Sequence, residues 1–400
     1  MFGEQRISMA ETRFIVAGRL IDGSGGPVQR QVFLAVRQGV IAGIGPASGL
    51  PAGTPSTAVT DLSHCTILPS LVDSSTCLSC SPSVDRAVRA SMAGADGAAR
   101  MAMLERHVHY CHVYGVLGVA DGDDATGLVT RYRQEKEATI EIRCSGPLCR
   151  TLQDCGKEAP TRDFLKIACS GDIAIREEPS PGPGQEELCR MLSCRGGRKA
   201  VVVANGRRRV AEALAAGCDA IEQGYGMGED NLRLMAERDI LWIPCVVRAR
   251  NGLDGAVGDG GVACRFSQRY ISPEKPVPGA EAFWKETLAG QLAQLRLARK
   301  LGVRTAVGTG AGGVGILHGE SMVEEMKLFL RAGYSLEETI RCASEHGARF
   351  FGMDGLGMLA PGRRATFLAV RGTVKQLPRK LSYLEDIYID GRPSTAYRKV

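Results

Sequence analysis

Residues 67–73, with the sequence ILPSLVD, form the stretch that decides the fold. Their apolar run predicts a strand over residues 67–72, and an acidic residue, Asp73, follows it directly. Short apolar runs of this kind recur along the chain, and helical patterns separate them, for example over residues 185–192 and 280–301. Alternating strands and helices predict βα units whose strands pair in a parallel sheet.

Seven further segments complete this series of predicted strands. They are residues 116–120, 140–144, 164–168, 200–203, 220–222, 241–244 and 305–307. Eight βα units over about 290 residues match the size of a (β/α)8 TIM barrel, so we predict the α/β class with a barrel over residues 65–357. In that fold the chemistry lies at the carboxyl ends of the strands, where we therefore place the candidate site.

Both ends of the chain predict short strands that cannot make a core alone. Before the barrel these are residues 13–17, 31–36, 40–44 and 57–62, and after it residues 366–370 and 386–390. A turn at residues 37–39 between two apolar segments is typical of a hairpin. We expect residues 1–64 and 358–400 to form one small composite β-sandwich, which the chain leaves for the barrel and to which it returns.

The composition is that of a globular chain and excludes several classes of protein. The 400 residues are 44% hydrophobic and 24% charged, with 50 glycines, which excludes a mainly disordered chain, a collagen and a coiled coil. The net charge of +6 is mild, and the basic clusters at residues 195–199 and 207–209 are short, so we expect no nucleic-acid partner. No apolar run is long enough to span a bilayer, so we expect no membrane partner either.

The cysteines and the N-terminus predict a cellular compartment. Residues 1–11 are polar and contain no apolar segment of a secretory signal. Fourteen cysteines in a chain without such a signal are typical of reduced thiols rather than of a disulfide framework. We therefore expect free thiols and a cytoplasmic protein.

Short motifs lie along the chain in the order and spacing of a known family. They are DGSG at 22–25, ILPSLVD at 67–73, LKI at 165–167, IEQG at 221–224, GT at 308–309, LHGE at 317–320, and LG at 356–357 followed by APGR at 360–363. From about residue 13 to residue 392 the chain resembles the metal-dependent amidohydrolase superfamily, especially its prolidase-like and imidazolonepropionase-like members. The resemblance implies a barrel with a β-sandwich built from both chain ends.

The resemblance also implies a divalent-metal site, usually with Zn, which turns bound water into hydroxide. The family's ligand positions are the two histidines after strand one, the histidines of strands five and six, and the aspartate of strand eight. In this chain those positions hold Ser75, Cys77, Val203, Gln223 and Gly310. Only the lysine of strand four, which the family often carboxylates, is retained, as Lys166.

This loss of ligands argues against the family's chemistry. Hydroxyl and amide groups are poor Zn ligands, and Val and Gly side chains offer no ligand atom. We therefore expect no cofactor, and no carboxylation of Lys166, because the metals that would hold the modified lysine are missing. Lys166 is expected to pair with Glu222, since two buried opposite charges need each other.

A rebuilt site is the alternative. Ser75 and Cys77 share one strand face, and Cys80 follows at C-x-x-C spacing. Together with Cys169 after strand four and Cys245 at the end of strand seven, these thiols would bind a soft metal or perform thiol chemistry. The opposing interpretation is that these small residues simply pack in the core.

Two histidine features are further candidates. Residues 107–112, HVHYCH, form a cluster of potential metal ligands at the end of a predicted helix. The alternative is that histidines lie there because the partial negative charge of a helix C-terminus favours them without any metal. His318 lies in the loop after strand eight, where the family commonly keeps a substrate-side histidine. It is either a ligand contact or a loop histidine bonded to the backbone.

These observations predict an amidohydrolase-family protein with a degenerate hydrolase site, which binds a small-molecule ligand or a partner subunit without hydrolysis. The expected partner is a second copy of the chain or a paralogue. The alternative is a hydrolase of carbon–nitrogen bonds, in non-peptide or dipeptide amides, with Cys77, Lys166 and His318 as catalytic residues and Zn if the site is rebuilt. The predicted substrate-binding residues are Ser75, Asn205, Gln223, Tyr225 and Cys245. No residue is assigned as a metal ligand.

Overall fold

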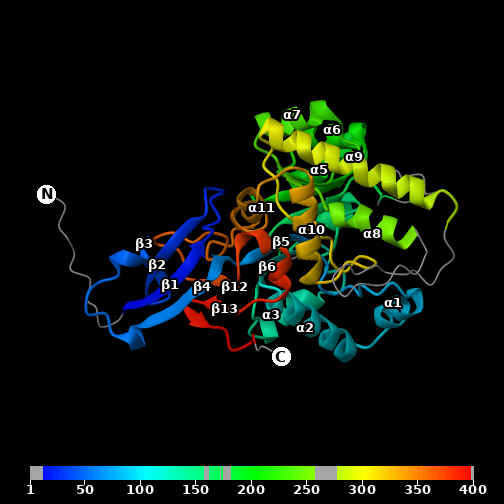
Figure 1. The fold of residues 1–400 in the computed structure, drawn as a ribbon. Helices are drawn as coiled ribbons and strands as arrows, with labels where there is room; N and C mark the ends of the chain where they lie inside the picture. The colour runs from blue at the N-terminus through cyan, green and yellow to red at the C-terminus, as the bar shows by residue number, and fades with distance from the viewer. Residues whose placement is uncertain (1–11, 157–161, 172, 174–181, 257–276, 398–400) are drawn as a thin grey trace.

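The structure, a computed structural model, describes residues 12–156, 162–171, 173, 182–256 and 277–397. The polar N-terminus, residues 1–11, lies outside the described residues. Hydrogen bonds arrange the strands in one sheet of seven and in two parallel sheets of four and three strands. Figure 1 shows the seven-stranded sheet on one side of the molecule and most of the helices around the smaller sheets on the other.

Strands from both ends of the chain build the seven-stranded sheet, in the order β14-β13-β12-β4-β1-β2-β3. They are β1 Thr12–Leu20, β2 Gln29–Arg37, β3 Val40–Pro46, β4 Val59–Pro69, β12 Phe367–Arg371, β13 Asp386–Ile389 and β14 Arg392–Pro393. The two ends therefore meet, as the sequence predicts. Because β4 pairs with β1 on one side and with β12 on the other, all seven strands form one sheet, and the predicted β-sandwich is not seen as two separate sheets.

The ILPSLVD stretch is where the chain passes from this sheet to the parallel strands. It does not form a single strand over residues 67–72, because it contains the end of β4 and the start of β5, Leu71–Thr76. Pro69 ends β4, and a proline has no backbone N–H with which to continue a ladder. From Leu71 onward the chain pairs with β6, Val116–Asp121, instead. β4 also runs across the predicted domain boundary at residues 64 and 65.

Two parallel sheets contain the strands of the predicted barrel. One is β5-β6-β7, and the other is β11-β10-β9-β8. The members not yet described are β7 Glu141–Cys144, β8 Leu165–Ala168, β9 Ala200–Ala204, β10 Ala220–Gln223 and β11 Leu241–Ile243. These elements and β6 match six of the predicted strands closely, whereas the first prediction is divided between β4 and β5.

The eighth predicted strand, residues 305–307, forms no assigned strand, because isolated contacts replace a continuous ladder on both of its sides. Thr305 makes a single parallel bridge with Trp242 of β11. On the other side, the backbone N–H of Ser74 in β5 donates to the carbonyl of Val307. Closure of all eight strands into a barrel stays a prediction.

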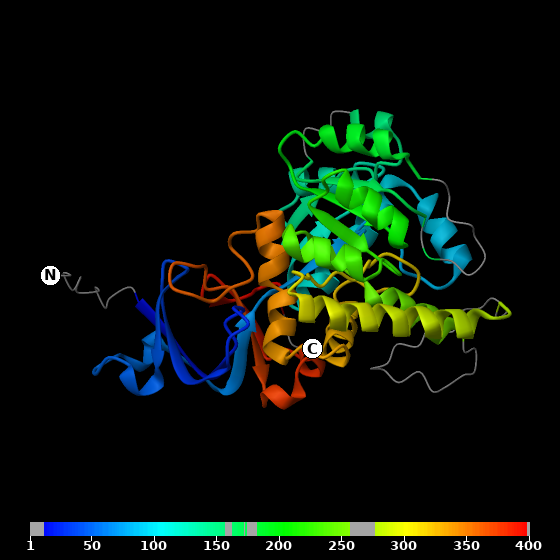
Figure 2. The ribbon, with the colours of Figure 1, turned by 90° about the horizontal axis from the view of Figure 1, so that it is seen from above.

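Helices alternate with the parallel strands, as the βα pattern predicts. Those in the described ranges are α1 Arg86–Ala93, α2 Gly97–Val113, α3 Leu128–Glu135, α4 Leu152–Gly156, α5 Gln185–Ser193, α6 Arg207–Ala215, α7 Glu229–Glu237, α8 Val246–Ala256, α9 Ala280–Leu301, α10 Glu320–Arg331, α11 Leu336–Cys342 and α12 Glu345–Phe351. Helix α9 has the predicted bounds and, as Figure 2 shows, is the longest of them; it packs against α7 and α8. None of these helices is both long enough and apolar enough to cross a bilayer.

Apolar side chains are buried in both regions. In the seven-stranded sheet, the ring of Phe367 is fully buried and stacks on Tyr388, with the ring centroids 4.6 Å apart. In the parallel strands, Ile221 and Trp242 are fully buried. Parallel strands covered on both faces hold the residues at their carboxyl ends in fixed positions, and the candidate site lies at those ends.

Candidate functional site

A cavity of about 450 Å³ lies at the carboxyl ends of the parallel strands, and we call it the strand-end cavity. Most of the residues that were predicted from the strand ends line it together. They are Ser75, Cys77, Lys166, Val203, Gln223, Cys245 and Gly310. The predicted convergence of these positions is therefore confirmed, whereas the roles assigned to them stay predictions.

Lys166 and Glu222 form a buried ion pair in the wall of this cavity. The Nζ of Lys166 lies 2.9 Å from Oε1 and 2.7 Å from Oε2 of Glu222, and the two side chains are only 8% and 7% exposed. Burial lowers the pKa of Lys166, but the Glu222 carboxylate outweighs this effect, so the pKa is raised overall. Lys166 is therefore a charged ammonium, and an ammonium has no electron pair with which to take up carbon dioxide. The predicted pairing of these two residues is confirmed.

Asp73 joins β5 to the segment that follows the eighth predicted strand. Its Oδ1 accepts hydrogen bonds from the backbone N–H of Ser75 at 3.2 Å and of Thr309 at 2.9 Å. Its Oδ2 accepts from the hydroxyl of Thr309 at 2.5 Å. Burial raises the pKa of Asp73 to about 6 despite these three donors. Asp73 thus holds β5 against the segment that contains Thr309, and it is not among the residues that line the cavity.

Gln223 is held in an uncommon backbone conformation at the end of β10. Its φ is 69°, in the left-handed region that residues with a side chain rarely adopt. Its carbonyl accepts from Trp242 Nε1 at 3.0 Å and from Gln291 Nε2 at 2.7 Å, while its Oε1 accepts from Asn205 Nδ2 at 2.7 Å. These contacts compensate for the strain and fix the Gln223 side chain at the cavity wall.

Two predicted substrate-binding residues, Asn205 and Tyr225, are not among the residues that line the cavity. The Oδ1 of Asn205 accepts from the backbone N–H of Tyr225 at 3.0 Å, and the Tyr225 hydroxyl donates to the carbonyl of Cys245 at 2.7 Å. Both polar side chains therefore bond to neighbouring protein groups. They support Gln223 and Cys245, which line the cavity.

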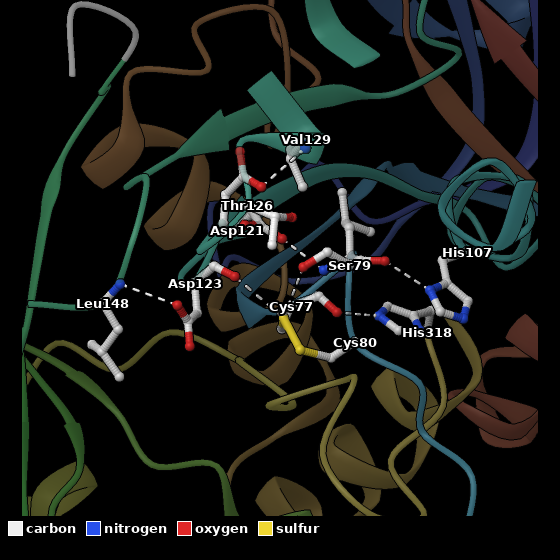
Figure 3. The surroundings of a disulfide bond; sticks show 12 residues. Cys77, Ser79, Cys80, His107, Asp121, Asp123, Thr126, Val129, Leu148 and His318 are labelled. Atoms are coloured by element: carbon white, nitrogen blue, oxygen red, sulfur yellow. Dashed lines mark hydrogen bonds between the residues drawn. A yellow bond between two sulfur atoms is a disulfide. The ribbon is translucent and has the colours of Figure 1, made fainter. Parts of the chain in front are cut away.

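Cys77 and Cys80 form a disulfide in the loop after β5, as Figure 3 shows. The prediction that the cysteines are all reduced thiols is wrong for this pair, because the C-x-x-C turn brings their Cα atoms to 5.5 Å, within the usual range for a disulfide. In this form Cys77 carries no thiol to act as a nucleophile or as a metal ligand.

The other two candidate cysteines are free and buried. Cys245 lines the cavity but is only 2% exposed, and burial raises its pKa well above the usual value. Cys169 is buried too, burial raises its pKa, and it is not part of the cavity wall. For both residues, packing in the core is the arrangement that the structure describes.

His318 lies behind the Cys77 loop and not in the cavity wall, so the predicted ligand contact is not seen. Its Nε2 donates to the carbonyl of Cys77 at 2.9 Å, and its ring stacks on His107 with centroids 3.9 Å apart. Burial, helped by His107, holds the pKa of His318 well below the usual value. The structure therefore has the other predicted arrangement, a loop histidine bonded to the backbone.

The histidines of the HVHYCH segment do not form a shared metal site. The Nδ1 of His107 bonds the carbonyl of Leu78 at 2.8 Å, whereas His112 bonds the carbonyl of Thr139 and the hydroxyl of Ser394. The two rings thus form hydrogen bonds with different segments of the chain. In the part of the chain that the structure describes, no group of three or more His, Cys, Asp or Glu residues is placed to hold a metal ion.

The residues at the family's metal positions do not fit a pair of zinc ions. Val203 and Gly310 have no ligand atoms in their side chains, and the amide oxygen of Gln223 already accepts from a neighbour. Cys77 is in a disulfide, and Lys166 is in an ion pair. This set of donors offers the metal no thiolate, imidazole or free carboxylate in the arrangement that the resemblance implies.

Several residues of the site were missed by sequence reasoning. Those that line the cavity include Arg150, Ser170, Arg248 and Thr309. Glu325 is fully buried and accepts from the N–H groups of Val246 and Val247 at the start of α8. Thr309 belongs to the GT motif, which the sequence analysis identified. Arg150 lies in a loop and Arg248 lies in the first turn of α8, and neither segment has a readable sequence pattern.

Comparisons with known proteins agree with this fold. Residues 205–393 match the family model described as the amidohydrolase family. An uncharacterized protein of Mycobacterium tuberculosis (strain ATCC 25618 / H37Rv) is 27% identical over 181 residues, which cover 45% of this chain and 43% of the relative. The matched part thus spans less than half the length of that relative.

Solved structures of hydrolases share the fold over almost the whole chain. A Xaa-Pro dipeptidase with bound methionine in its active site has a TM-score of 0.77 at 20% identity, over 96% of this chain and 99% of that chain. The ochratoxinase of A. niger has a TM-score of 0.77 at 15% identity, over 96% of this chain and 95% of that chain. At such identities the likeness concerns the fold alone.

The fold and the strand-end cavity define the class of protein, an α/β protein with its site at the carboxyl ends of parallel strands. With the match of residues 205–393 to the amidohydrolase family model, they agree with the resemblance drawn from the motifs.

Proposed function

We propose that this chain binds a small polar molecule in the strand-end cavity without hydrolysing it. The observation that carries the proposal is the ion pair of Lys166 and Glu222. The resemblance assigns Lys166 to the family's bridging lysine, and here a carboxylate replaces the metals as its partner. The position that the resemblance assigns to metal chemistry is thus part of an ion pair without net charge in the cavity wall.

The remaining candidate groups also support a non-hydrolytic function. Hydrolysis needs an activated water and a group that takes its proton. The oxygens of Asp73 accept three hydrogen bonds, His318 lies behind the loop, and Cys77 is bonded to Cys80. None of these groups is placed to activate a water in the cavity.

The cavity wall indicates the chemistry of the ligand. A volume of about 450 Å³ suits a metabolite-sized molecule. Arg150 and Arg248 line it together with the hydroxyl-bearing Ser75 and Ser170. Because guanidinium groups bind carboxylates and phosphates well, the ligand class proposed is a small molecule with an anionic group.

Hydrolysis assays test the proposal directly. Pure wild-type protein is incubated with N-acyl amino acids, dipeptides and cyclic amides, with and without added Zn, Mn or Co, in oxidising and in reducing buffer. We expect no turnover above the rate without protein. Turnover that a chelator abolishes would overturn the proposal.

The structural neighbours are hydrolases, and this favours a second candidate function: hydrolysis of carbon–nitrogen bonds by a rebuilt thiol site around Cys77. It predicts turnover in reducing buffer that Cys77→Ala removes. The matched control is Cys189→Ala, which changes an exposed free cysteine.

The proposed partner, a second copy of the chain or a paralogue, is tested separately by size-exclusion chromatography with light scattering.

A further inference from the structure

We propose that the Cys77–Cys80 disulfide is a redox-active modification site, which exchanges with small thiols that enter the strand-end cavity. Both cysteines line the cavity and are partly exposed, whereas Cys245 in the same wall is buried. A small thiol that reaches the cavity therefore meets this disulfide. The proposal concerns the wall of the cavity and does not depend on whether the chain hydrolyses its ligand.

The turn around the disulfide is held by contacts that do not involve the sulfur atoms. The carbonyl of Cys77 accepts from His318, and the carbonyl of Leu78 bonds His107. The N–H of Leu78 donates to Oδ2 of Asp121 at 2.6 Å. Since these bonds hold the turn in either state, breaking the disulfide leaves the loop in place. A cross-link across so short a loop also adds little to the stability of the fold, so a purely structural role is a weak explanation.

Groups that suit a thiol already lie beside Cys77. Its sulfur is 3.5 Å from the hydroxyl of Ser79 and 3.5 Å from the carbonyl of Asp123, as Figure 3 shows. The Ser79 hydroxyl is placed to donate to a Cys77 thiolate and so to stabilise its charge. Once the thiol is protonated, it is placed to donate to the Asp123 carbonyl.

These contacts indicate which of the two sulfurs the incoming thiolate attacks and which one leaves. A thiolate RS⁻ attacks the sulfur of Cys80, the Cys77–Cys80 bond breaks, and Cys77 leaves as a thiolate beside Ser79. A second RS⁻ attacks the sulfur of R in the mixed disulfide, which releases RSSR and the Cys80 thiolate. The two protons from the original thiols end on Cys77 and Cys80, so two RSH reduce one protein disulfide.

The state of the disulfide also acts on the neighbouring segment of the cavity wall, residues 311–312. A Cβ at Gly312 would lie 2.4 Å from the carbonyl oxygen of Cys77 and 3.0 Å from the Cβ of Cys80, so the two segments are in close contact. The N–H of Cys77 donates to the carbonyl of Ala311 at 2.7 Å. Gly312 and Ala311 both line the cavity. When the disulfide breaks, the backbone of the turn stays in place but the two sulfurs separate, so the packing of the Cys80 side chain against Gly312 changes, and the shape of the cavity changes with it.

Labelling of the native full-length chain tests the exchange. The protein is treated with glutathione for increasing times and then with N-ethylmaleimide, and its peptides are analysed by mass spectrometry. We expect Cys77 and Cys80 to be labelled only after glutathione, and buried Cys245 to stay unlabelled. Labelling without glutathione overturns the proposal because the disulfide is then absent. Labelling that occurs only after the protein is unfolded overturns it too, because the disulfide is then closed to thiols.

A pair of variants tests the assigned direction. Ser79→Ala removes the hydroxyl beside Cys77 and should slow the exchange at least about threefold, since a hydrogen bond to the leaving thiolate is lost. Ser81→Ala, in the same loop, is the matched control and should exchange at the wild-type rate; its hydroxyl accepts from the backbone N–H of Ser83. Equal rates for both variants, with unchanged circular dichroism, contradict the role of Cys77 as leaving group.

Hydrogen exchange of the peptide that contains residues 309–316 tests the effect on the cavity. We expect faster exchange in the reduced protein than in the oxidised protein. The double variant Cys77→Ser/Cys80→Ser should resemble the reduced protein under both conditions. Identical exchange in all forms overturns the coupling to the cavity wall.

Discussion

The seven-stranded sheet and the strand-end cavity bury different kinds of side chain. In the sheet, a fully buried residue such as Phe367 is apolar, and strand register places it beside its neighbour Tyr388. At the cavity, the buried groups include charged ones such as Lys166, which depends on the carboxylate of Glu222. Such partners are distant in sequence, since Lys166 and Glu222 are 56 residues apart.

This difference shows that the two regions should respond differently to substitution. Many sequences satisfy an apolar core if they keep volume and pattern. A buried charge, in contrast, tolerates the loss of its partner poorly. In this chain the motifs that carry the resemblance are present, whereas two of the positions that the resemblance assigns to the metal site, Lys166 and Cys77, are in an ion pair and in a disulfide. The predictions below test this contrast, from the largest expected effect to the smallest.

The largest effect is expected at the cavity. Glu222→Leu leaves the Lys166 ammonium buried without its carboxylate, because the pair is less than a tenth exposed. We expect a loss of about 4 kcal/mol in the free energy of unfolding. Urea-induced unfolding followed by circular dichroism measures it.

Two controls accompany this variant. The double variant Lys166→Met/Glu222→Leu removes both charges and should recover most of the lost stability. Asp390→Asn weakens the largely exposed pair of Arg364 and Asp390 and should cost no more than about 1 kcal/mol. If Glu222→Leu costs as little as Asp390→Asn, then the cavity pair is solvated and the contrast between the two regions fails.

A smaller but still large effect is expected in the sheet. Phe367→Ala opens a space beside Tyr388 and should lower the free energy of unfolding by about 3 kcal/mol. Val40→Ala, at a position of the same sheet that is 37% exposed, should cost less than about 0.5 kcal/mol. Because the contacts described for Phe367 and for Glu222 have no residue in common, Phe367→Ala and Glu222→Leu should be additive in the combined variant. A coupling above about 1 kcal/mol would mean that the two regions are not independent.

The smallest effect concerns pH. Burial raises the pKa of Asp121 from 3.8 to about 7. The folded protein therefore binds more protons than the unfolded chain between about pH 4 and pH 7. The stability from this group is fully present below about pH 4 and is lost as the pH rises through about 7.

Asp121→Asn tests whether Asp121 causes this loss of stability with rising pH. The amide is neutral at every pH, and it keeps an oxygen that accepts from the N–H of Leu78. From pH 5 to pH 8, wild-type protein should lose about 2 to 3 kcal/mol more stability than the variant. The raised pKa values of Asp73 and Glu325 act in the same direction in both proteins, so they cancel in the comparison. Parallel stability curves for the two proteins would contradict the assignment.

Local pattern predicted most of the strands and helices. Helix α9 begins and ends where its periodicity does, because glycines with φ of 83° and 77° stand directly before and after it. The ILPSLVD stretch is the instructive exception. Its apolar run is continuous, but hydrogen-bond partners change at Pro69, and apolarity carries no information about which sheet a residue joins.

For the candidate site, the sequence by itself determined which residues stand at the strand ends, since strand positions follow from pattern and motif. It also predicted the pair of Lys166 and Glu222, because unlike buried charges require each other. Only the tertiary structure decided that Cys77 is bonded to Cys80 and that His318 lies behind their loop. The physical reason is that loop side chains have no repeating period, so their partners depend on which distant segments the folded strands bring beside them.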